Sequence, residues 1–162
     1  MSPRLAIAVA CGLASLWSAQ AVSAEPAQKP AALAQPGLYG GAAPFVSVTL
    51  TQCLTSGPQN ERSAAFLAEM TAGAHSVRMA VRIEIQQRAP GEVSFHTLTA
   101  PGLGAWHESV AGVTTYRYLD RVTGLSAPGS YRAVAHFRWL GGGNHQIRQQ
   151  ERHSSSCLTP AG

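Results

Sequence analysis

The sequence has few charged side chains and almost no lysine. Charged residues make up 12% of the 162 residues, the formal net charge is +4, and Lys29 is the only lysine. Domains that bind nucleic acid usually carry dense basic patches or stripes. We therefore expect no nucleic-acid partner.

Motifs of common enzyme and metal sites are also absent. The sequence has no G-x-S-x-G, no H-E-x-x-H and no G-K-[ST] after the glycine run 141–143, which is typical of a hairpin turn instead. Its six histidines show no recurrent ligand spacing. We expect no catalytic residue, no cofactor and no metal. A catalytic triad assembled from distant residues would leave no motif, so that alternative stays open.

The first 24 residues have the pattern of a signal peptide. Arg4 precedes an apolar run over residues 5–17 that is too short to cross a bilayer, and Val22-Ser23-Ala24 supplies the small residues of a cleavage site. We predict cleavage after Ala24, with cleavage after Ala21 as the alternative. This predicts a secreted or periplasmic protein with no transmembrane segment in the mature chain. The other interpretation of the same residues is an N-terminal membrane anchor.

The rest of the chain divides into a linker, one domain and a short tail. Residues 25–44 are rich in Ala, Pro and Gly and show no apolar period, so we interpret them as a flexible linker. We expect the domain over residues 45–158 and a C-terminal tail over 159–162. About seven strand-like segments lie within the domain. They are 45–51, 63–72, 75–87, 92–99, 113–125, a strand from Tyr131, and a polar last strand ending at Cys157.

Two of these segments bear most on the fold class. From Val77 to Ile85 apolar residues occupy every second position, the period of a half-buried strand. Residues 63–72 contain helix-forming residues, but a sandwich lacks one strand without them, so we predict a strand there and keep a helix as the alternative. The prediction is an all-β fold, a single immunoglobulin-like (fibronectin III-like) antiparallel β-sandwich of about seven strands.

Residues 124–140 carry the most specific pattern of the chain. Leu125, a Pro128-Gly129 turn and a strand opening at Tyr131 have the layout of a tyrosine corner. In that structure the leucine packs inward and the phenol hydroxyl bonds to backbone near the turn. Beyond Tyr131, residues of two faces alternate up to Trp139, which predicts another half-buried strand.

The run L-x-x-P-G-x-Y-x-A-x-A-x-F over residues 125–137 resembles the corner of fibronectin type III modules. The span from Val46 to Cys157 resembles the CARDB-like immunoglobulin-fold domains of exported bacterial proteins. This resemblance implies surface display or binding, and it brings no catalytic residues. Met79 and Val81 occupy the centre of the third strand, where antibody-type domains have a buried tryptophan, so an antigen-receptor-like domain is disfavoured.

Only Cys53 and Cys157 remain after removal of the signal peptide, and in an exported chain we predict that they form one disulfide. Free thiols or a metal pair are the alternatives. In immunoglobulin-like sandwiches the first strand can pair parallel to the last, which would bring the two strand ends together. Cys53 has the opposite parity to Val46 and Leu50, so we expect a bulge or the strand's end to reorient it.

Basic side chains fall on the expected solvent side of two neighbouring strands. They form a candidate face for an anionic partner, made of Arg78, Arg82, Arg132, His136 and Arg138, with Arg148 and Arg152 expected on the next strand. Glu84 and Glu151 interrupt this face. The alternative interpretation is an ordinary solvated surface.

Trp106 and His107 lie in the long loop before residue 113 and are the candidate loop contacts. An alternative role for Trp106, slightly favoured, is to plug the open edge of the sandwich. Together these observations predict a secreted or periplasmic, non-catalytic binding or adhesion module of the cell envelope. Its expected partner is an envelope protein or an anionic glycan. The alternative is a structural accessory domain that stabilises an envelope assembly through edge-strand contacts.

Overall fold

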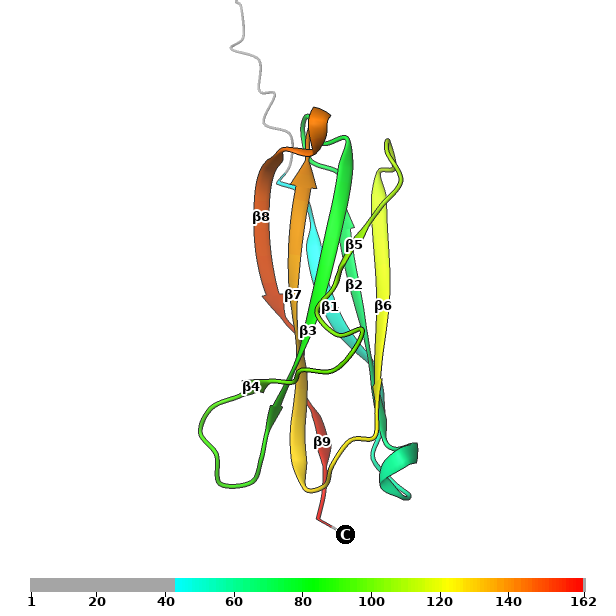
Figure 1. The fold of residues 1–162 in the computed structure, drawn as a ribbon, viewed down its shortest axis with the longest axis vertical. Coiled ribbons are helices and arrows are strands. Elements are labelled where there is room, and N and C mark those ends of the chain that lie inside the picture. Colours follow the sequence, from blue (N-terminus) through cyan, green and yellow to red (C-terminus); the bar gives the residue numbers. More distant parts are fainter. Residues whose placement is uncertain (1–42, 162) are drawn as a thin grey trace, which may run out of the picture. The chain divides into compact units, whose positions relative to one another are not determined.

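The computed structural model describes residues 43–161 (Figure 1). The expected signal peptide, 1–24, and nearly all of the expected linker, 25–44, lie outside the described residues. The described part contains nine strands and two single 3-10 turns, η1 (Gln59–Glu61) and η2 (Gly142–Asn144), and it has no α-helix. The last strand ends at Thr159, one residue beyond the expected domain boundary.

The strands form two antiparallel sheets that pack face to face. A three-stranded sheet has the order β1 (Val46–Leu54), β2 (Ser63–Thr71) and β6 (Thr115–Thr123). A six-stranded sheet has β3 (Arg78–Arg88), β7 (Gly129–Leu140) and β8 (Gln146–His153) as its long strands. Short strands β4 (His96–Thr97) and β5 (Trp106–Glu108) pair with β3, and β9 (Cys157–Thr159) pairs with β7. The all-β sandwich predicted from the sequence is confirmed.

Residues 63–71 are strand β2, as predicted, and not a helix. The strand lies between β1 and β6, and Ala64, Phe66, Ala68 and Met70 are fully buried. Burial between two neighbouring strands outweighs the modest helix preference of these residue types.

The described part of the chain has nine strands where about seven were expected, and three local differences account for this. The expected strand 92–99 is reduced to the two residues of β4, β5 forms within the long loop, and the last strand is broken into β8 and β9.

The core of the sandwich depends on the pairing of β3 with β7. The two strands are in continuous antiparallel register from Arg78 opposite Leu140 to Arg88 opposite Ser130. Their inward residues are almost completely buried: Met79, Val81, Ile83, Ile85, Tyr131, Ala133, Ala135, Phe137 and Trp139. Val77, expected in this inward row, is 44% exposed because β3 begins only at Arg78.

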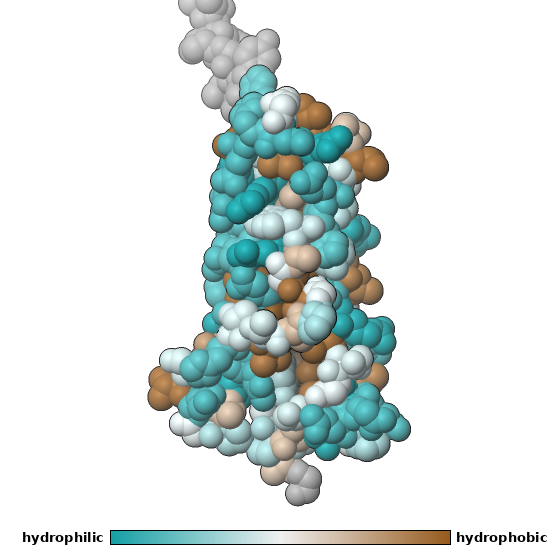
Figure 2. Space-filling model, viewed as in Figure 1, coloured by the Kyte–Doolittle hydropathy of each residue, from teal (hydrophilic) through white to brown (hydrophobic). Residues whose placement is uncertain are grey.

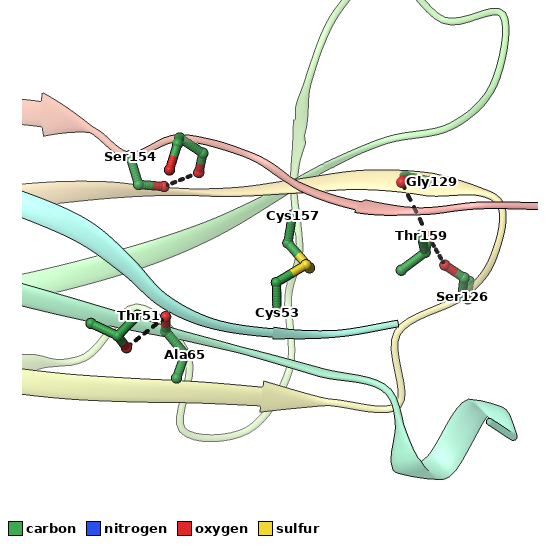
Figure 3. The surroundings of a disulfide bond; sticks show 9 residues. Thr51, Cys53, Ala65, Ser126, Gly129, Ser154, Cys157 and Thr159 are labelled. Carbon is green, nitrogen blue, oxygen red and sulfur yellow. Dashed lines mark hydrogen bonds between the residues drawn. A yellow bond between two sulfur atoms is a disulfide. The ribbon is translucent and has the colours of Figure 1, made fainter. Parts of the chain in front are cut away.

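The turn before β7 has the hydrogen bonds of a tyrosine corner. The Tyr131 hydroxyl donates to the Ser126 carbonyl at 3.0 Å, and it accepts from the Gln87 side chain at 3.0 Å. Leu125 is buried beside it at 2% exposure. Thr159 of β9 also donates to the Ser126 carbonyl, at 2.8 Å, so the corner and the last strand share one acceptor (Figure 3).

Cys53 and Cys157 form a disulfide that joins the two sheets, with their Cα atoms 5.5 Å apart (Figure 3). The expected parallel pairing of the first and last strands is wrong. β1 pairs with β2 and β9 pairs with β7, so the bond crosses between layers. The register of β1 slips at Thr51, whose hydroxyl donates to the Ala65 carbonyl at 3.1 Å. This bulge reverses the parity of the strand, so Cys53 points to the side of the other sheet and reaches the buried Cys157, while Cys53 itself stays exposed.

Loss of the disulfide is expected to destabilise the fold strongly. The bond closes a loop with a sequence separation of 104, which corresponds to about 4 kcal/mol in the chain-entropy model. Reduction of the wild type, or Cys157→Ser, should therefore lower the midpoint of chemical unfolding, and non-reducing peptide mapping should recover one linked pair. As a control, a reductant should leave the midpoint of the double variant Cys53→Ser/Cys157→Ser unchanged. Two alkylatable thiols in the native protein would contradict the bond.

Candidate functional site

The outer face of the six-stranded sheet, meaning its side away from the core, carries the predicted basic residues. Directly opposed residues of paired strands point to the same side. Arg82 lies opposite His136 in the register of β3 and β7, and Ala80 lies opposite Arg138. The structure thus places all five predicted residues on one face: Arg78, Arg82, Arg132, His136 and Arg138.

Arg148 and Arg152 of β8 do not belong to this face, contrary to expectation. They lie opposite Trp139 and Ala135, whose side chains point inward. The register of β7 and β8 slips between Leu140 opposite Gln146 and Trp139 opposite Arg148, so one extra residue, Ile147, is inserted. This bulge reverses the parity of the rest of β8.

Trp106 joins the outer face from β5. It lies opposite Arg82 in the β3–β5 register. The centroid of its ring is 3.9 Å from the guanidinium carbon of Arg138 and 5.3 Å from that of Arg82. We call these three residues the Trp106 cluster. The Nε atoms of both arginines are buried and have no hydrogen-bond partner among the described residues. The loop residue Trp106 and the basic face, two separate candidates in the sequence, therefore belong to one surface.

A second pairing of cation and ring lies further along the same face. The centroid of the Phe95 ring is 4.0 Å from the guanidinium carbon of Arg132 and 4.9 Å from that of Arg88. Arg132 also donates to the Gln86 side chain at 2.9 Å. We call Phe95, Arg88 and Arg132 the Phe95 cluster. Phe95 is not among the predicted site residues, because residues 92–99 were expected to form a regular strand. The available signal was an aromatic residue a few positions after the Pro90-Gly91 turn.

Between the two clusters the face carries carboxylates. His136, with only 12% of its side chain exposed, lies 3.6 Å from Glu84 and 3.3 Å from Glu151. Glu84 also pairs with Arg82 at 2.7 Å. At the start of β3, beyond the Trp106 cluster, Arg78 pairs with Glu108 at 3.7 Å. In contrast, Arg132 and Arg138 have no carboxylate within 4 Å among residues 43–161. The outer face is therefore basic at two positions and neutralised between them. In Figure 2, hydrophilic residues dominate the view, with hydrophobic ones scattered among them.

His107, not Trp106, closes the open edge between the sheets. It lies opposite the inward Val81, and its ring stacks on Tyr118 of β6 with centroids 3.9 Å apart. Burial at this edge raises the pKa of the Asp120 carboxyl, while the backbone N–H of Arg121 and the nearby His107 act in the opposite direction. Burial likewise raises the pKa of the Tyr118 hydroxyl.

Comparison with known proteins identifies no family for this chain. No protein-family model matches the chain, and no curated protein matches it. Two solved structures from Bacteroides uniformis are loosely similar. They are β-glucuronidase 2 covalently bound to cyclophellitol-6-carboxylate aziridine, at TM-score 0.39 and 16% identity, and β-glucuronidase, at TM-score 0.38 and 15% identity. Each alignment covers 69% of this chain and 13% of the other chain. Similarity at these TM-scores carries no argument.

Two features are absent from the described residues. No helix between residues 43 and 161 is long and apolar enough to span a membrane. The same residues contain no group of three or more His, Cys, Asp or Glu side chains that could hold a metal ion.

The raised pKa of Asp120 predicts a pH-dependent effect on stability. Because the folded protein holds this proton more tightly than the unfolded chain, the favourable contribution of Asp120 is complete at acid pH and is lost as pH rises through its folded pKa. Asp120→Asn should therefore raise the thermal midpoint relative to wild type at pH 7, with an advantage that shrinks below about pH 4. Glu69→Gln, which breaks the ion pair of the half-buried Glu69 with the exposed Arg117, is the control and should show no such gain. A pH-independent difference for Asp120→Asn would contradict the account.

Proposed function

We propose that this chain is an exported, non-catalytic binding module of the cell envelope, and that its outer face holds an anionic glycan chain. One observation carries the proposal. Arg132 and Arg138 lie on the same face of β7, each against an aromatic ring and without a carboxylate within 4 Å among the described residues. Cations that are positioned but not neutralised are suited to an anionic partner. Surface display is also what the resemblance to CARDB-like domains implies.

The spacing of the two arginines favours a polymer over a small anion. They are six residues apart on one strand, which corresponds to about 20 Å at the usual rise per residue. A small anion reaches one guanidinium at a time, whereas a chain with a charge on successive sugars reaches both. Binding at two linked positions strengthens the whole interaction through effective concentration.

The surroundings of Trp106 favour a sugar as the carrier of the charge. A pocket of about 220 Å³ beside the ring is lined by Ala80, Trp106, Glu108, Arg138, Leu140 and Asn144. An aromatic ring with a few polar side chains around it is the usual composition of a ligand pocket. The stacked rings also hold the arginines in place, so less side-chain entropy is lost on binding.

Export is part of the proposal, since a glycan of the envelope lies outside the cytoplasm. The disulfide is compatible with an oxidising compartment. The small-residue site then predicts that the exported protein begins at Glu25, or at Val22 if the alternative site is used. N-terminal sequencing of the exported product measures this directly. A retained Met1 would overturn this part of the proposal.

The binding proposal is tested by removing the two free arginines. We expect Arg132→Ser/Arg138→Ser to fold normally, because the inward residues of β7 are untouched, and to bind alginate, an anionic polyuronate, about tenfold or more weakly than wild type. Wild-type binding should weaken with added salt, and this dependence should flatten in the variant. Biolayer interferometry over a salt series gives both quantities, with the neutral glucan dextran as the ligand control.

The matched control is Arg117→Ser/Arg121→Ser on β6 of the other sheet, which removes the same formal charge. It should keep nearly the wild-type affinity. Equal weakening in both double variants would show that only net charge matters. Equal binding by all three proteins would mean that the outer arginines are a solvated surface, and it would favour a structural accessory role, to be sought as copurification with one protein at fixed stoichiometry.

A further inference from the structure

A pocket of about 310 Å³ lies on the outer face where β3, β7 and β9 meet, close to the tyrosine corner. Arg88 lies opposite Ser130, and Ser130 lies opposite Leu158 in the next pair, so these three side chains form a row across three strands. The turn of residues 89–92 and Pro128 complete the lining. In Figure 1 this is the end of the sheet that carries β9.

The base of this pocket contains a hydroxyl without a partner. Ser130 is 5% exposed, and its Oγ atom makes no hydrogen bond within the described part of the chain. Buried polar atoms are nearly always hydrogen-bonded, and each exception needs an explanation. A ligand that accepts the proton of this hydroxyl would supply one.

A cationic side chain, Arg88, lines the same pocket from the position opposite Ser130. Arg88 has no carboxylate within 4 Å among residues 43–161, and its guanidinium carbon lies 4.9 Å from the ring of Phe95. Glu92 also lines the pocket, but it is already engaged. One of its carboxylate oxygens accepts from the backbone N–H of Ala89 at 2.9 Å, and the other lies 3.8 Å from His96. The pocket therefore offers donors for an anion at its base.

The pocket also has apolar lining. Leu158, across Ser130 from Arg88, is 65% exposed, and Pro90 and Pro128 line the same pocket. The volume is at the lower end of the range for small-molecule sites, enough for one group the size of an amino acid. An arginine fork and a hydroxyl are the donors that carboxylates prefer.

We propose that this pocket binds a carboxylate carried on a small apolar group. The carboxylate accepts from the Arg88 guanidinium and the Ser130 hydroxyl, and the apolar group covers Leu158. The chemistry is shared by a free small acid and by the C-terminal residue of a peptide. The proposal does not depend on the glycan proposal, which concerns Arg132 and Arg138.

The test is a titration of ¹⁵N-labelled protein, residues 25–162, with N-acetylleucine, followed by amide chemical shifts. We expect saturable shifts at Arg88, Ser130 and Leu158, with a dissociation constant of about 1 mM for so small a ligand. N-acetylleucinamide, which has the same apolar group and no charge, should give no saturable shift. Equal shifts from the amide, or no saturable shift from the acid at those residues, would overturn the proposal.

Substitutions separate the two donors. Arg88→Gln should weaken N-acetylleucine binding about tenfold, and Ser130→Ala about threefold to tenfold, in line with charge-assisted hydrogen bonds. Arg88→Lys keeps the charge but lacks the fork, so an intermediate loss is expected. Arg121→Gln on the other sheet is the matched control and should bind like wild type. Thermal unfolding of each variant verifies the fold, and unchanged binding in both Arg88→Gln and Ser130→Ala would contradict the site.

A second arm identifies the source of the carboxylate. A hexapeptide ending in leucine is compared with its C-terminally amidated form and with N-acetylleucine. Binding of the free peptide at least tenfold tighter than N-acetylleucine indicates a peptide C-terminus, and equal or weaker binding indicates a free acid. Binding of the amidated peptide as tightly as the free peptide would again overturn the proposal.

Discussion

The antiparallel pairing of β3 with β7 is the constraint on which the rest of the structure depends. One continuous register, from Arg78 opposite Leu140 to Arg88 opposite Ser130, decides which residues form the core and which form the outer face. A slip of one residue would turn the arginines inward and expose Phe137 and Trp139. The fold and the candidate site therefore depend on the same alternation of inward and outward residues along β3 and β7. The large free-energy cost of burying unpaired guanidinium groups disfavours the shifted register.

The end of the sandwich that carries β9 is held by several independent connections. The disulfide ties Cys157 to β1, Tyr131 lies opposite Cys157, and both Tyr131 and Thr159 donate to the Ser126 carbonyl. The proposed carboxylate pocket is built on these same strands. A pocket whose walls are fixed in this way loses little entropy when a ligand binds, which is the physical advantage of placing a small site there.

The sequence predicts the features that follow from the alternation of apolar and polar residues along a strand and from the residue types that form turns. It indicates the two sheets, strand β2, and the shared face of Arg82 and Arg138. It fails where one inserted residue changes parity. The parity of Cys53, opposite to that of Val46 and Leu50, predicts either a bulge or a reorientation at the strand's end, and the structure has a bulge at Thr51. The bulge at Ile147 has no such signal in the sequence, and it places Arg148 and Arg152 on the other side. The positions of Trp106 and Phe95 depend on how a long loop folds back on the sheet. Local residue patterns do not predict the path of such a loop.

The central claim is that Arg132 and Arg138 bind one anionic chain together. The most direct measurement is a titration with alginate that follows the Nε–Hε resonances of the arginine side chains by NMR. The account predicts that the resonances of Arg132 and Arg138 move and saturate at the same alginate concentration, while those of Arg117 and Arg121 stay in place. Saturation of Arg132 and Arg138 at different concentrations, or equal movement of all four arginines, would contradict it.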